Sequence, residues 1–316
     1  LSAPILYWYV LKLTRPELKI KLRHILNLVP FIMAVLYLYQ HTIFISTEEM
    51  ILLNYYYIPH PLDIFVFEAY LLPMGIYFYF NFKILAFYRK FVRQEFSSID
   101  SINLSWLGFL LYVCLSIYII LLFFIVFFYI KDPANLYIIF IFWPIVHSIF
   151  IVILGYKGIM QHEIFTDPRT VPEEIPAAAD GKTFLPPEKI REIIDKLTAV
   201  MDKNRPYLDP GLTLPMLADM VDVPRNYLSL AINEGAGLNF YDFINLYRVR
   251  EVKKQLEDPA NHETNLLNLA FSSGFNSKAT FNSVFKKNTG LTPTEYKKSI
   301  SKQNIESPAA TVEDYV

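Results

Sequence analysis

Two stretches near the C-terminal end of the chain share one pattern: residues 217–238, LADMVDVPRNYLSLAINEGAGL, and residues 269–291, LAFSSGFNSKATFNSVFKKNTGL. Each begins with a Leu-Ala pair, continues through apolar residues at helical spacing and ends with Gly-Leu. The two copies are 52 residues apart at the Leu-Ala pair and 53 residues apart from Leu228 and Phe281 onward. The pattern predicts a short helix, a tight turn and a second helix, twice in succession.

In the first copy, residues 214–220 are expected to form the first helix. The small Ala218 suits the point where the two helices cross, and Val223 should anchor the turn between them. Leu228 and Ile232 should bury one face of the second helix. The opposite face then carries three polar side chains near its N-terminus, where a recognition helix meets base edges in the major groove: Arg225, Asn226 and Ser229.

The second copy is expected to begin near Asn265. Gly274 permits a tight turn, while Phe275 and Phe281 should fill the core. The outward-facing residues at the start of the second helix are Lys278, Asn282 and Ser283. From residue 273 to residue 302 there are six Lys and one acid, Glu295, and this local positive charge favours contact with phosphates although the whole chain has a net charge of -1.

A longer helix is predicted over residues 240–257, which at 1.5 Å per residue would be about 25 Å long and would hold the two copies apart. Another helix is expected to start at Pro187 and to run to about Lys203. Either copy alone would also fit an ordinary helical hairpin. Two copies in register favour a DNA-reading protein.

Residues 207–298 resemble the DNA-binding domain of the AraC/XylS family of transcription regulators. The most specific stretch is residues 270–296, with Gly274-Phe275, Phe285-Lys286-Lys287 and Thr292-Pro293 in the family's arrangement. The resemblance implies seven helices, with the two recognition helices in successive major-groove turns, and sequence-specific binding to promoter DNA. Carried onto this chain, it implies base reading by Arg225, Asn226, Ser229, Lys278, Asn282 and Ser283, and backbone contacts by Lys286 and Lys287.

The N-terminal half has a different composition, and the soluble β-barrel that most of this family carries is not expected in it. The chain is 53% hydrophobic and 16% aromatic, and most of that excess lies before residue 160. Four apolar stretches are about as long as the roughly 20 residues that cross a bilayer: residues 26–45, 64–85, 105–130 and 136–156. Residues 1–13 resemble the end of a fifth, so we expect further sequence before Leu1. A buried core of soluble helices is the alternative.

Loop charges predict the orientation of these spans. Two alternate loops carry nine basic residues: Lys12, Arg15, Lys19, Lys21, Arg23, Lys83, Arg89, Lys90 and Arg93. The other two loops carry only Lys131. Positive loops stay inside, so the chain should leave its last span on the cytoplasmic side of a bacterial inner membrane.

Four polar residues in or near the spans are candidates for signal sensing, because ionisable groups in a bilayer are costly and often functional: His60, Asp63, Glu68 and His147. Pairing with a neighbouring helix is the simpler explanation. We predict a transmembrane region over residues 1–161, a Pro-rich linker over 162–186, a DNA-binding domain over 187–302 and a flexible tail over 303–316.

The sequence thus predicts an all-α protein that acts as a membrane-anchored, sequence-specific transcription regulator, coupling a membrane or extracytoplasmic signal to promoter DNA. No catalytic motif, metal site or cofactor is indicated, and the single Cys114 allows no intrachain disulfide. The expected partners are double-stranded DNA and a lipid bilayer, with RNA polymerase, a second copy of the chain and an unknown signal as further candidates. A membrane enzyme or transporter with a regulatory DNA-binding tail is the alternative, and a purely structural membrane tether is a third reading.

Overall fold

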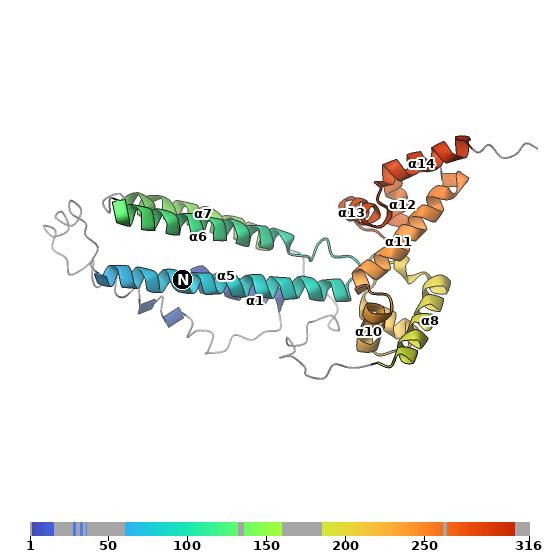
Figure 1. Ribbon diagram of the computed structural model, residues 1–316, viewed down its shortest axis with the longest axis horizontal. Helices are drawn as coiled ribbons and strands as arrows, with labels where there is room; N and C mark the ends of the chain where they lie inside the picture. Colours follow the sequence, from blue (N-terminus) through green and yellow to red (C-terminus); the bar gives the residue numbers. More distant parts are fainter. Residues whose placement is uncertain are drawn as a thin grey trace, which may run out of the picture. The chain divides into compact units, whose positions relative to one another are not determined.

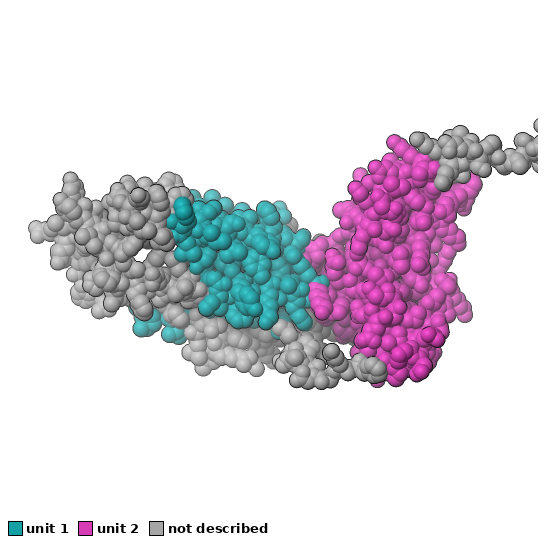
Figure 2. Space-filling view, viewed as in Figure 1, with its two compact units in different colours: residues 1–89, 104–164 teal, residues 90–103, 165–316 magenta. Residues whose placement is uncertain are grey.

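The computed structural model describes residues 2–15, 28–29, 32–33, 36, 61–131, 136–159, 185–261 and 264–306. Within these ranges every regular element is a helix, and the β structure is one isolated bridge between Phe96 and Thr213. The expected all-α class is therefore confirmed for the described residues. The chain divides into two compact units (Figure 2): unit 1 comprises residues 1–89 and 104–164, and unit 2 comprises residues 90–103 and 165–316.

The helices of the N-terminal half follow the apolar stretches of the sequence (Figure 1). They are α1 (Ser2–Thr14), α5 (Pro61–Glu95), α6 (Ser105–Lys131) and α7 (Leu136–Ile159). Large apolar side chains such as Phe109 and Phe123 on α6 are exposed at 72% and 65%. The expected span over residues 26–45 lies almost entirely outside the described residues, and so do residues 162–184 of the linker expected over 162–186.

Within the described residues, one helical stretch, Ser105–Phe123, is long and apolar enough to cross a membrane. Its mean hydropathy is 2.4, and 28% of it is buried. A core helix of a soluble protein can have the same length and hydropathy. The structure therefore establishes that these stretches are helical, and a bundle of several spans stays a prediction.

Unit 2 contains the seven α-helices that the family resemblance implies, together with two short 3₁₀ turns, within residues 185–306. They are α8 (Pro187–Asn204), η4 (Pro206–Leu208), α9 (Leu214–Val221), α10 (Arg225–Gly235), α11 (Phe240–Glu257), η5 (Pro259–Asn261), α12 (Leu266–Ser272), α13 (Lys278–Thr289) and α14 (Pro293–Glu306). Helix α11 runs from the group of α8 and α10 to the group of α12, α13 and α14 (Figure 1). The expected helix over residues 240–257 is confirmed at both ends.

Side-chain caps fix where these helices begin. A polar side chain at the N-cap accepts a hydrogen bond from a backbone N–H that has no partner inside the helix, which stabilises the first turn by about 1 kcal/mol. The capping residues of α9, α11, α12 and α13 are Thr213, Asn239, Asn265 and Ser277. Each of these helices therefore starts at a position that the local sequence encodes.

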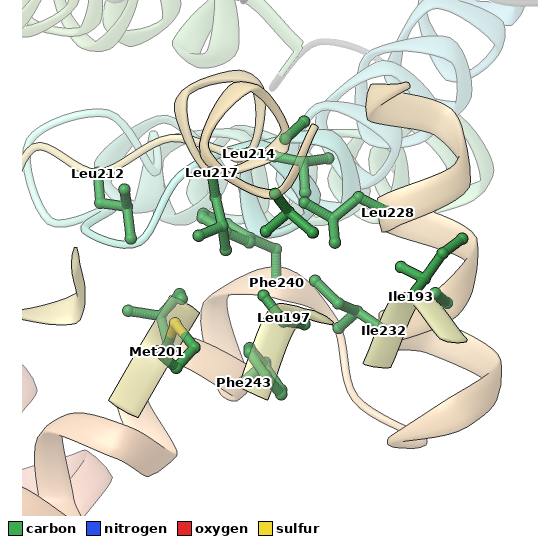
Figure 3. Close-up of a cluster of buried hydrophobic side chains, with 14 of the residues drawn as sticks. Ile193, Leu197, Met201, Leu212, Leu214, Leu217, Leu228, Ile232, Phe240 and Phe243 are labelled. Atoms are coloured by element: carbon green, nitrogen blue, oxygen red, sulfur yellow. The ribbon is translucent and has the colours of Figure 1, made fainter. Parts of the chain in front are cut away.

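The first pair of short helices is held by an apolar core with α8 (Figure 3). Helix α8 presents Ile193, Leu197 and Met201 on one buried face, in line with its helical periodicity in the sequence. They lie in the same cluster as Leu217 on α9 and Ile232 on α10. Burial of each such side chain contributes roughly 1.5–3 kcal/mol, so the position of α10 is fixed by packing rather than by its own helix propensity.

The second pair of short helices has an aromatic core. The rings of Phe275 and Phe281 lie 5.3 Å apart between centroids, those of Phe281 and Phe285 5.6 Å, and those of Phe285 and Tyr296 5.4 Å. This chain of contacts joins α13 to α14 and confirms the expected core role of Phe275 and Phe281.

The turn of the second pair requires glycine at position 274. Gly274 has a φ of +91°, and an added methyl would overlap the Tyr207 carbonyl oxygen and lie 2.9 Å from Arg248 Nε. We expect Gly274→Ala to lower the local stability of α11–α13 by about 3 kcal/mol. Hydrogen exchange of peptides from these helices in the full chain measures the effect.

Gly237→Ala is the matched control. Gly237 also has a positive φ, +67°, but an added methyl would meet nothing within 4 Å. The cost should therefore be only the left-handed backbone, about 1 kcal/mol. Equal losses of protection in the two variants would contradict the assigned close contact.

Candidate nucleic-acid interface

The two turns have the same hydrogen-bonding geometry. In the first, the Val223 N–H donates to the Ala218 carbonyl at 3.1 Å, and in the second the Phe275 N–H donates to the Ala270 carbonyl at 3.1 Å. Both alanines are buried, as expected where two helices cross. A left-handed residue precedes each donor: Asp222 with φ +57° and Gly274 with φ +91°. Both regions are therefore helix-turn-helix units built on one plan.

Helix α10 carries the first set of sequence-predicted site residues. Arg225 is its first residue and is partly exposed, and Asn226 is exposed. Ser229 is partly exposed, and its carbonyl and hydroxyl oxygens accept hydrogen bonds from Asn233 Nδ2 at 2.8 and 3.4 Å. Leu230, one residue further on, packs against the buried core.

Helix α13 carries the second set on an open surface. Lys278, Asn282 and Ser283 are all exposed. Lys278 and Asn282 are four residues apart and so share one face of the helix. Among the described residues, this face combines a long cation with hydrogen-bonding side chains.

The two lysines predicted to contact the DNA backbone lie in the last turn of α13. Lys286 is exposed, while Lys287 is exposed and also pairs with Asp242 of α11, with Nζ 2.8 Å from Oδ1. The Lys287 side chain is 63% exposed and that of Asp242 is 20% exposed, and an ion pair so open to solvent on one side contributes little stability. A phosphate could therefore replace Asp242 at modest cost.

Arg225 has a partner that the sequence did not indicate. Its Nη2 and Nε lie 2.7 and 3.2 Å from Oε1 of Glu95, the last residue of α5. The Glu95 side chain is only 6% exposed, whereas that of Arg225 is 35% exposed. Burial raises the pKa of the Glu95 carboxyl above its usual value, and the hydrogen bond and charge of Arg225 oppose that rise.

A second acid from the same part of the chain reaches α13. The Thr280 hydroxyl, in the first turn of α13, donates a hydrogen bond to the carboxylate of Asp100. Glu95 and Asp100 are the two acidic residues between positions 86 and 104. These two acids stand out in a segment whose other charged residues are all basic, and they were the sequence signal for these contacts.

Arg248 of α11 is the largest of the fully buried side chains among the described residues, at 1% exposure. Its guanidinium donates to the carbonyls of Tyr207, Asp209 and Ser97 at 2.8, 2.9 and 2.8 Å. It also donates to the hydroxyls of Ser97 and Ser98 at 2.9 and 3.3 Å. Burial lowers the pKa of Arg248 to about 10, so the side chain keeps its charge at neutral pH.

The four candidates for signal sensing are not placed by the structure. His60 lies outside the described residues, and the side chains of Asp63, Glu68 and His147 do as well. Within the described part of the chain, no group of three or more His, Cys, Asp or Glu side chains is arranged to hold a metal ion.

Comparison with known proteins agrees with this geometry. Residues 217–299 match the model of a family described as a helix-turn-helix domain. An HTH-type transcriptional regulator of Staphylococcus aureus strain COL is 29% identical over 103 residues, which are 33% of this chain and 13% of the relative. A regulator of strain MSSA476 matches over the same shares at the same identity. The matched region thus spans about an eighth of these curated relatives.

Two solved structures are also similar. A Listeria innocua protein of unknown function is 30% identical, with 34% of this chain and 96% of that chain covered and a TM-score of 0.30. The C-terminal domain of AraT, a response regulator from Geobacillus stearothermophilus, is 23% identical, with 36% and 87% covered and a TM-score of 0.27. The family match and the HTH-type relatives support one conclusion: the C-terminal region of this chain is an AraC-type helix-turn-helix DNA-binding domain of the kind found in transcription regulators.

Proposed function

We propose that this chain is a membrane-anchored transcription regulator that binds specific promoter sequences and couples a membrane or extracytoplasmic signal to that binding. The observation that carries the DNA-binding part is the repeated turn geometry, which gives two recognition helices on one rigid connector. Helix α11 has 18 residues and is therefore about 27 Å long. This length is comparable with the roughly 34 Å between successive major-groove turns on one face of DNA.

The base-reading roles follow from position and chemistry. Arg225, Asn226 and Ser229 lie at or near the start of α10, and Lys278, Asn282 and Ser283 lie on the exposed first half of α13. Lys and Arg suit guanine and Asn suits adenine, and each good bidentate pair adds about 1–3 kcal/mol of discrimination. Lys286 and Lys287 are proposed to contact phosphates.

Membrane anchoring is supported by the N-terminal half. The four apolar stretches that the structure describes are helical, and Ser105–Phe123 has the length and hydropathy of a span. Basic residues gather at and beyond the ends of the first and third apolar stretches, several of them in the last turns of α5, and this pattern favours a bacterial inner-membrane location with the DNA-binding domain in the cytoplasm. A signal would then act through these helices by changing how the domain binds DNA, and no covalent bond would be made or broken.

Genome-wide crosslinking of the chain to DNA in its host tests this function. The full chain is compared with a form that lacks residues 1–161, and carbonate extraction of membranes follows each form. Discrete promoter peaks in both forms, with only the full chain retained in the membrane fraction, are the expected result. Absence of peaks in both forms would overturn DNA-based regulation and favour the membrane enzyme or transporter.

Two lysine variants separate base reading from phosphate contact. Lys278→Ala should relax the sequence preference, because it removes a base-edge donor, with little effect on binding to random DNA. Lys286→Ala should weaken binding to all sequences and lower the slope of log K against log salt by about one. Selection from a random duplex pool and salt titrations by fluorescence anisotropy measure both effects.

Lys254→Ala is the control for net charge, because Lys254 is exposed in the last turn of α11 and belongs to neither recognition helix. It should match the wild type in preference and in salt slope. If Lys278→Ala and Lys286→Ala both bound the selected site like the wild type, the assignment of α13 as a recognition helix would be wrong.

A further inference from the structure

The segment between α5 and α6 belongs to the same compact unit as the DNA-binding domain. This segment, residues 90–103, is called the connecting segment below. It comprises the last turns of α5 and the loop that ends just before α6. It contacts both helix-turn-helix units, although it lies more than 100 residues before them in the chain.

The contacts fall on the ends of the recognition helices that would approach DNA. Glu95 of the connecting segment is paired with Arg225, the first residue of α10. Asp100 accepts a hydrogen bond from Thr280, in the first turn of α13. Both contacts place a carboxylate at a helix N-terminus, which favours negative charge and would otherwise be open to a DNA phosphate or base edge.

We propose that the connecting segment is a built-in inhibitor of DNA binding: its Glu95 and Asp100 carboxylates occupy the recognition helices and must leave Arg225 and Thr280 before the domain engages its site, while the anchor at Ser97 is kept. This inference rests on the proposed function, because it names how the proposed DNA-binding surface is regulated. A DNA duplex and the connecting segment would compete for the same donors, Nε and Nη2 of Arg225 and the hydroxyl of Thr280.

The connecting segment is held by more than the two acids. Arg248 donates to the Ser97 carbonyl and hydroxyl, and the Ser97 N–H donates to the Leu212 carbonyl at 3.2 Å. Ile99 and Ile102 are buried at 8% and 6% exposure, and the Arg93 guanidinium lies 5.6 Å from the centre of the Tyr241 ring. These contacts lie apart from Arg225 and Thr280, so they can position the segment without using a recognition residue.

The inhibitory contact also has a cost that makes it reversible. Glu95 Oε2 is buried and has no hydrogen-bond partner among the described atoms. A buried carboxylate oxygen without a partner destabilises the state that contains it. Because Glu95 ends α5 and the segment leads directly into α6, a displacement of either helix would act on this contact.

The first test removes the two acids. The double variant Glu95→Gln, Asp100→Asn is compared with the wild type as full chains in detergent, with a fluorescent duplex selected by the wild-type chain from a random pool. Because the two contacts are proposed to compete with DNA, their loss should lower the Kd of the chain for the duplex. We expect a decrease of about tenfold for the double variant. Circular dichroism of each variant checks that the helices are retained.

The matched control is Glu188→Gln, Asp195→Asn, which removes the same charge from exposed positions on α8. Its Kd should change less than about twofold, so a nonspecific effect of charge on DNA binding is accounted for. An unchanged or higher Kd in the Glu95→Gln, Asp100→Asn variant, with the wild type binding normally, would overturn the inhibition alone. Failure of the wild type and both variants to select any duplex would overturn the proposed function as well.

A second test locks the connecting segment in place. Asp100→Cys and Thr280→Cys, in a chain with Cys114→Ser, are oxidised to a disulfide. The locked chain should lose DNA binding by at least about tenfold and should recover it on reduction, whereas each single cysteine variant should be insensitive to oxidation. Full binding by the locked chain would show that the segment does not obstruct DNA. Failure of the disulfide to form would show that the segment does not rest on α13; either result overturns the proposal.

Discussion

The guanidinium of Arg248 lies where three parts of unit 2 meet. It donates to carbonyls in residues 207–209, to Ser97 of the connecting segment, and its Nε would lie 2.9 Å from a methyl added at Gly274. A buried arginine needs its donors satisfied, because an unpaired buried charge costs several kcal/mol. The three regions must therefore keep their relative positions for the side chain to remain buried, and α11, which carries it, connects the two helix-turn-helix units.

This constraint explains why the two helix-turn-helix pairs can act as one domain. The first helix-turn-helix pair packs with α8 through aliphatic side chains, and the second pair packs with α14 through edge-to-face aromatic contacts. Each core is separate, so neither fixes the distance between the recognition helices. That distance depends on α11, which contacts both cores and is capped at its start by Asn239. A recognition surface with two reading heads depends on such a connector, because DNA presents its major grooves at a fixed spacing.

The connecting segment adds a polar layer to this architecture. Its carboxylates meet Arg225 and Thr280, which belong to the helices proposed to read DNA, while its backbone is fixed by Arg248 and Leu212. One segment thus uses Ser97 to hold itself on the domain and uses Glu95 and Asp100 to cover the recognition helices. Because the two tasks belong to different residues, the acids can leave the recognition helices while Ser97 keeps the segment bound to the domain.

Local sequence determined most of the domain's helices. The bounds of α11, the start of α8 at Pro187 and the tight turn at Gly274 follow from apolar periodicity, caps and backbone freedom, which are properties of neighbouring residues. The exposure of Lys278, Asn282 and Lys286 follows in the same way. The ion pair of Arg225 with Glu95 and the hydrogen bonds of Arg248 to Ser97 were decided only by the tertiary structure, since they join residues 130 and 151 positions apart. Periodicity gives the face on which a side chain lies, but its partner depends on how distant segments pack.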